Sequence, residues 1–148
     1  MKLIQKRRFQ TRTDLKDLDK VLAWFDHFQN LAQYPIPENV WLQCQLALVE
    51  GFTNAVRHAH QSLAAETPIE IEVVIFSEAL EIYIWDRGPG FDVQNWLRKT
   101  PQVIDKDSEG GRGLRLMERI ADRFTYTPET NGRNCLYIRK SYRPIETD

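Results

Sequence analysis

The 148-residue sequence has little cysteine, no surplus of charge of either sign and no long hydrophobic run. Its 20 Lys and Arg residues nearly balance 21 Asp and Glu residues, which disfavours a general nucleic-acid or anionic-membrane binder. Nowhere do about 18 apolar residues follow one another, and the charged N-terminal segment has no apolar signal-peptide core. We therefore expect a soluble, cytoplasmic protein that binds neither a membrane nor nucleic acid directly.

The two cysteines, Cys44 and Cys135, are far apart in the sequence and show no metal-ligand spacing. We interpret them as free thiols in a reducing compartment, with a disulfide between them as the alternative. Hydrophobic residues make up 42% of the chain and four are Trp, which disfavours disorder. No repeat or Gly/Ser/Pro linker divides the sequence, so a single domain over residues 1–148 is expected.

Hydrophobic periodicity predicts the order strand, helix, helix, strand, strand, loop, helix, strand, strand. The predicted helices cover residues 13–33, 37–60 and 113–122, and the predicted strands cover residues 3–11, 69–75, 80–84, 124–127 and 135–140. This order predicts an α/β (α+β) two-layer sandwich, a mixed or antiparallel sheet with three main helices on one face. Residues 92–112 lack periodicity, and a loop of that length predicts a functional lid.

The predicted second helix carries an acid, an amide and a cation at helical spacing. Glu50 and Asn54 are four residues apart and Arg57 continues the line, so all three are expected on one polar face. A carboxylate accepts protons, an amide oxygen holds hard cations and a guanidinium pairs with phosphate oxygens, which suits a Mg-phosphate group. An ordinary solvated helix face is the other interpretation.

A second candidate segment follows the strand at 80–84. Asp86 at a strand end can accept a hydrogen bond from an exocyclic amine, while Gly88 and Gly90 let the backbone approach a planar base. A plain Asp-x-Gly turn would explain the same residues.

The third candidate segment, Gly110-Gly111-Arg112-Gly113-Leu114, lies where the predicted lid meets the third helix. Glycines at a helix start leave amide N–H groups approachable, and the helix dipole there favours phosphate. Arg112 adds a mobile positive charge. A flexible hinge without a ligand is the alternative.

In this order, the acid/Asn helix, the Asp-x-Gly-x-Gly strand end and the Gly-x-Gly helix start resemble the Bergerat-fold (GHKL) ATPases over about residues 14–140. The gyrase, Hsp90 and mismatch-repair branches use this domain in much longer chains with transducer domains, so we do not expect this protein among them. Histidine-kinase catalytic domains usually have Asn where this chain has Glu50. The Glu-x-x-x-Asn spacing and Gly-Arg-Gly-Leu-x-Leu-Met resemble the anti-sigma factor serine/threonine kinases of bacterial partner-switching systems.

The resemblance implies a role for each motif residue. Glu50 would be the general base that takes the proton from a Ser or Thr hydroxyl of a partner protein. Asn54 would hold Mg²⁺, and Asp86 would bind the adenine amine of ATP. Arg57 and His58 would lie near the phosphates, with a purely structural role as the alternative for His58 alone. Gly88 and Gly90 would line the base pocket. The residues implied over the phosphates are Gly111, Arg112, Gly113 and Leu114.

The implied function is an ATP- and Mg-dependent serine/threonine kinase that inhibits a sigma factor, phosphorylates a STAS-type antagonist and works as a homodimer. Kinases of this family can carry an Arg in the lid just before the Gly-x-Gly stretch, where this chain has Ser108 and Glu109. Arg112 or Lys106 could substitute for it. The alternatives are a non-enzymatic ATP-gated binding switch and an orphan histidine-kinase-like ATPase module.

Overall fold

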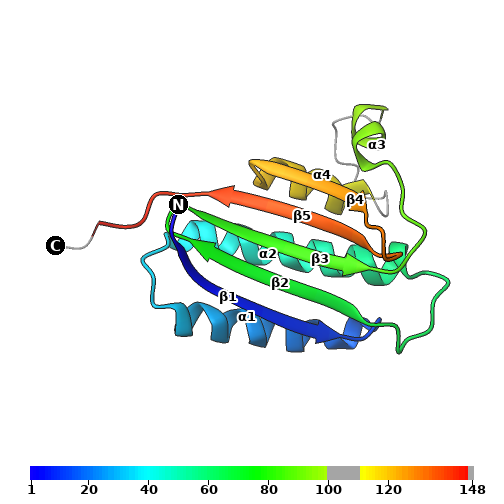
Figure 1. Ribbon diagram of the computed structural model, residues 1–148, viewed down its shortest axis with the longest axis horizontal. Coiled ribbons are helices and arrows are strands. Elements are labelled where there is room, and N and C mark those ends of the chain that lie inside the picture. Colours follow the sequence, from blue (N-terminus) through cyan, green and yellow to red (C-terminus); the bar gives the residue numbers. More distant parts are fainter. Residues whose placement is uncertain (100–110, 147–148) are drawn as a thin grey trace.

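A computed structural model describes residues 1–99 and 111–146 of the chain. Five strands form one sheet of order β1-β2-β3-β5-β4, in which every neighbouring pair is antiparallel. Helices α1, α2 and α4 lie on one face of this sheet (Figure 1). The strands are β1 (Leu3–Thr11), β2 (Ile69–Phe76), β3 (Ala79–Asp86), β4 (Arg123–Pro128) and β5 (Asn134–Ser141). The helices are α1 (Leu18–Ala32), α2 (Glu38–Asn54), α3 (Val93–Lys99) and α4 (Gly111–Ile120), with short helical turns η1 (Leu15–Asp17) and η2 (Ala55–Ala59).

The two-layer α+β sandwich predicted from periodicity is confirmed, and its sheet is antiparallel rather than mixed. Alternate residues of β2 and β3 point toward the helices, where they meet the apolar stripe of α2 in one core. Close packing of α2 on β3 depends on Gly51, because a Cβ there would lie 2.5 Å from Ile84 Cδ1. The end of α2 is thereby held against the end of β3.

The structure differs from the prediction within residues 92–112, for which the sequence predicts an unbroken loop. Residues 93–99 form α3, which begins after Asp92, whose carboxylate accepts a hydrogen bond from the Asn95 N–H at 3.0 Å. Val93 and Leu97, one turn apart, are buried. Two apolar residues are too few to show a helical period in the sequence, which is why α3 was missed.

A second difference lies at the end of the predicted second helix. Regular α-helix ends at Asn54, and residues 55–59 form the π-helical turn η2. The N–H of His60 donates to the carbonyl of Ala55 at 2.9 Å, which closes this wider turn. The 3.6-residue spacing therefore cannot be extended beyond Asn54.

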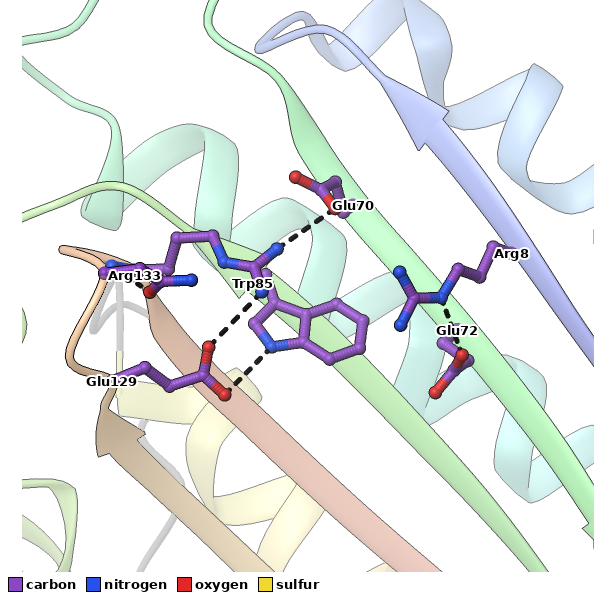
Figure 2. Close-up of polar contacts among 7 residues, drawn as sticks. Arg8, Glu70, Glu72, Trp85, Glu129 and Arg133 are labelled. Carbon is purple, nitrogen blue, oxygen red and sulfur yellow. Dashed lines mark hydrogen bonds and ion pairs between the residues drawn. The ribbon is translucent and has the colours of Figure 1, made fainter.

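The opposite face of the sheet is covered by its own side chains (Figure 2). Trp85, which is 8% exposed, lies between the guanidinium groups of Arg8 and Arg133, at 5.4 and 5.2 Å from its ring. Its indole N–H donates to Glu129 at 3.3 Å, and Arg8 pairs with Glu72 at 2.7 Å. These cation–π contacts and ion pairs shield the strands where no described helix does.

Within the described residues, no helix combines the length and the apolar character needed to cross a membrane. Cys44 and Cys135 are both buried and unbonded, which confirms the prediction of free thiols. Burial raises the pKa of both thiols to about 12, so both are protonated at neutral pH.

The buried carboxylate of Asp17 ties the end of β1 to the start of the helical layer. It accepts hydrogen bonds from the Thr11 hydroxyl at 2.7 Å and the Arg12 N–H at 3.1 Å, and Lys20 pairs with it at 3.6 Å. The Thr11 hydrogen bond, assisted by Arg12 and Lys20 and opposed by burial, holds the pKa of Asp17 well below its usual range.

We expect Asp17→Asn to lower the free energy of unfolding at pH 7 by about 1–3 kcal/mol, because the replacement loses charge-assisted hydrogen bonds. The contribution of the wild-type carboxylate is fully present above the unfolded-state pKa near 3.8 and is lost as the pH falls toward the lower folded-state value. Urea unfolding between pH 7 and 3 measures both effects. Asp19→Asn, exposed in the first turn of α1, is the control; equal losses in both variants would contradict this role.

Candidate nucleotide site

Helix α2 brings Glu50 to the N-terminal end of α4. A Cβ placed on Gly113 would lie 2.7 Å from Glu50 Oε2, so the carboxylate lies directly against the first turn of α4. Only glycine leaves room for this approach. The first and third candidate segments, far apart in the sequence, therefore meet in space, and a carboxylate faces a helix start.

Asn54 lies one turn further along α2 and is 8% exposed. Its side-chain amide makes no hydrogen bond to any other residue within the described ranges. No Asn54 atom is among the fully enclosed, unpaired side-chain atoms of the described residues, so the small exposed part of Asn54 includes its amide, which is open to a ligand.

The residues at the end of α2 also fit Mg²⁺. No group of three His, Cys, Asp or Glu side chains within residues 1–99 and 111–146 could hold a metal ion unaided. Mg²⁺ is commonly bound by one or two protein oxygens together with substrate phosphates. The Asn54 amide oxygen, with Glu50 one turn away, could supply such a ligand.

Arg57 and His58 lie in η2 and are exposed. Their predicted position in line with Glu50 and Asn54 assumed continuous α-helical spacing, and η2 ends that spacing. The α-helical spacing predicted from Asn54 to Arg57 is therefore wrong, and the shared polar face stays a prediction. Contacts of Arg57 and His58 with phosphate stay predictions.

Asp86, at the end of β3, is 2% exposed and is held by three protein donors. Its Oδ1 accepts from the Gly88 N–H and from Asn134 Nδ2, both at 2.9 Å, and its Oδ2 accepts from the Tyr126 hydroxyl at 2.7 Å. A carboxylate has about four acceptor sites, so one remains, on Oδ2. A single N–H of an exocyclic amine would satisfy it.

Sequence reasoning missed Tyr126 and Asn134. In the β3–β5 register Asn134 lies directly opposite Asp86, a relation that only the strand pairing reveals. Burial, and secondarily the hydrogen bond to Asp86, raises the pKa of Tyr126 well above its usual value, so its hydroxyl stays a donor.

A cleft of ≈ 430 Å³ lies next to two of the residues that hold this carboxylate, and Asp86 itself is not part of its lining. Its lining includes Gly90, Phe91, Tyr126 and Asn134, so two residues that hold Asp86 also face the cleft. Gly90 has φ +75° and approaches Asn134 so closely that a Cβ would lie 2.8 Å from its Oδ1. Gly90 thus lines a cleft, and its contact with a base stays a prediction.

Gly88 is needed for packing. A Cβ there would lie 2.2 Å from the carbonyl oxygen of Ala59, and Gly88 is not in the lining of this cleft, so its contact with the base stays a prediction. The missing side chain lets the loop after β3 pack on η2, so the second candidate segment is joined to the helix that carries Glu50.

The third candidate segment begins α4 at Gly111, two residues earlier than predicted. Arg112 is exposed, and Leu114 is buried in the hydrophobic core, so Leu114 could meet a phosphate only through its backbone. Of the predicted lid, residues 100–110 lie outside the described part of the chain, and with them Lys106, Ser108, Glu109 and Gly110.

Comparison with known proteins identifies the family. The family model of the histidine kinase-like ATPase domain matches residues 11–140. The chain belongs to this family. The predicted resemblance to Bergerat-fold ATPases is thereby confirmed, and the cleft beside Asp86 lies in a domain of ATPase type.

The chain is also similar to serine-protein kinases named RsbW. It is 35% identical to that of Bacillus licheniformis over 83 residues, which cover 53% of this chain and 52% of the relative. It is 36% identical to that of Bacillus subtilis over 83 residues, or 53% of this chain and 51% of the relative. The matched part of the chain thus spans about half the length of these curated relatives.

A solved structure of RsbU and RsbW domains from Mycobacterium tuberculosis shares the fold. Its TM-score is 0.64 at 12% identity, and the alignment covers 96% of this chain and 35% of that one. This likeness supports the ATPase fold of the histidine kinase-like domain.

We expect Asp86→Asn to weaken ATP binding about 10- to 100-fold, because an amide N–H would face the amine where a carboxylate acceptor now lies. Tyr126 can turn to donate or accept, so the fold should persist. Calorimetric titration with ATP measures the affinity. Asp26→Asn, exposed on α1 and not part of the cleft lining, is the control, and unchanged affinity in Asp86→Asn would remove Asp86 from the base site.

Proposed function

We propose that residues 1–148 form one ATP- and Mg-dependent serine/threonine kinase domain that acts as an anti-sigma factor in a bacterial partner-switching system. Its substrate is a STAS-type anti-sigma factor antagonist. The carrying observation is the carboxylate of Glu50 against the first turn of α4, one helical turn from the unpaired amide of Asn54. The serine-protein kinase names of the relatives support the reaction class.

The proposed reaction divides the work among three places. Asp86 accepts a hydrogen bond from the adenine amine. The N–H groups at the start of α4, with Arg112, stabilise phosphate charge. ATP supplies the γ-phosphoryl group, and Mg²⁺ held at Asn54 offsets the charge of its phosphates.

Glu50 takes the proton of the partner's Ser or Thr hydroxyl. As the hydroxyl oxygen bonds to the γ-phosphorus, the bond from that phosphorus to the β–γ bridging oxygen breaks and ADP leaves. The products are the phosphorylated partner, ADP and one proton, first carried by Glu50. Positioning and charge stabilisation supply most of the rate enhancement in this reaction class.

The proposed kinase is a cytoplasmic homodimer. It binds a sigma factor until the antagonist displaces that factor. Aromatic residues on α1 are used mainly in the core: Phe25 and Phe28 are buried, and Trp24 stacks between Phe9 and Phe28. The dimer contact is therefore expected elsewhere than at Phe25 and Phe28.

The lid sequence favours a second candidate, a non-enzymatic switch in which ATP controls partner affinity. Ser108 and Glu109 stand where kinases of this family can carry an Arg. Tight ATP binding without transfer to any STAS-type partner would support this switch. A histidine-kinase-like module would instead place acid-labile phosphate on a partner His.

We expect Glu50→Gln to slow phosphoryl transfer about 10²- to 10⁴-fold, because the amide cannot take the hydroxyl proton. ATP affinity should change little. Transfer from radiolabelled Mg-ATP to a purified STAS-type partner, with ATP affinity measured in parallel, separates the two effects. Glu38→Gln, exposed at the start of the same helix, is the matched control, and transfer that survives Glu50→Gln would exclude Glu50 as the base.

A further inference from the structure

His60 is a buried side chain, 1% exposed, that the proposed reaction does not use. It follows η2, and both its ring nitrogens are engaged. Nδ1 lies 2.7 Å from the hydroxyl oxygen of Thr13, and Nε2 accepts the backbone N–H of Arg87 at 2.7 Å. One imidazole thus joins the segment after β1 to the loop after β3.

The hydrogen-bond partners fix the tautomer of this ring. The single hydroxyl hydrogen of Thr13 is donated to the carbonyl of Thr67 at 2.7 Å, so Nδ1 of His60 must be the donor in its contact with Thr13. The Arg87 N–H can only donate, so Nε2 must carry a lone pair. His60 is therefore neutral, with its proton on Nδ1.

The environment of the ring maintains that state. Burial lowers the pKa of His60, Arg87 lowers it further, and the negative charge of Asp86 acts in the opposite direction. The net lowering keeps Nε2 free to accept at neutral pH. Protonation would place two N–H donors face to face at Arg87.

The loop held by His60 directly follows Asp86, the last residue of β3. Arg87 lies between Asp86 and Gly88, whose N–H donates to Asp86 and whose carbonyl accepts from Asn134 at 2.9 Å. His60 therefore holds one side of the loop and Asn134 holds the other. These two hydrogen bonds fix the loop that follows Asp86 and, with it, the direction of the one remaining acceptor site of Asp86.

We propose that His60 is a positioning residue of the nucleotide site, whose Nε2 holds the Arg87 amide so that Asp86 presents its free acceptor to the base. The proposal rests on the proposed function, because it assumes that Asp86 binds adenine. Nε2 is the essential atom, while the Nδ1 contact with Thr13 only fixes the orientation of the ring.

Two amide variants separate the two ring nitrogens. In His60→Gln the side-chain oxygen can reach the position of Nε2 and accept from Arg87. In His60→Asn the shorter amide can reach the position of Nδ1, which keeps the Thr13 contact and loses the acceptor. Three quantities are measured on both variants: ATP affinity by calorimetry, stability by urea unfolding, and hydrogen exchange of the Arg87 amide. His27→Asn, exposed on α1, is the control.

We expect His60→Gln to bind ATP like wild type within about threefold, and His60→Asn to bind at least about tenfold more weakly. The Arg87 amide should exchange slowly in wild type and His60→Gln, and fast in His60→Asn. Equal affinities in the two variants, or an affinity that follows stability alone, would overturn the proposal.

The exchange measurement separates this proposal from the proposed function. If wild type binds no ATP but the Arg87 amide is protected in the expected pattern, the proposed function fails and the tether from His60 to the loop stands. If wild type binds ATP and Arg87 is unprotected in every variant, the positioning role fails alone.

Discussion

The buried carboxylate of Asp86 is the constraint on which the site depends. A charge with 2% exposure is tolerable only when donors surround it, and three donors from different parts of the chain do so. They come from the loop after β3, from β4 through Tyr126 and from β5 through Asn134. Three segments are thereby fixed around one carboxylate, and the cleft beside it has a defined shape.

Side chains of β3 and of the start of β5 make contacts on both faces of the sheet. Asp86 and Asn134 face the helical layer, while the neighbouring residues Trp85 and Arg133 are in contact on the opposite face (Figure 2). Arg133 also pairs with Glu70 at 3.0 Å. The outer ion pairs and ring contacts therefore help to hold the strand register that places Asn134 opposite Asp86.

The sequence was sufficient to predict what repeats along the chain. Alternation in β2 and β3 and the apolar stripe of α2 report burial directly, so the sandwich and the order of its elements followed from them. Asp86 stood out because it follows an apolar strand and precedes Gly88 and Gly90, and Glu50 stood out because Asn54 lies one helical turn away.

What the sequence could not supply depends on contacts between distant residues. The role of Asn134 follows only from the strand register that places it opposite Asp86. The role of His60 follows only from its hydrogen bonds with Arg87 and Thr13. The turn η2 has no periodic signature in the sequence. The α-helical spacing was therefore continued to Arg57, although the regular helix ends three residues earlier, at Asn54. The packing role of Gly88 was not foreseeable either, because it depends on the close approach of η2 to the loop after β3.

The contact between Gly113 and Glu50 couples position 113 to the carboxylate. A Cβ there would lie 2.7 Å from Glu50 Oε2, so a larger residue would turn the carboxylate away from the first turn of α4, although the acid itself is unchanged. The place of the carboxylate is therefore set by two positions, one that supplies the acid and one that leaves room for it.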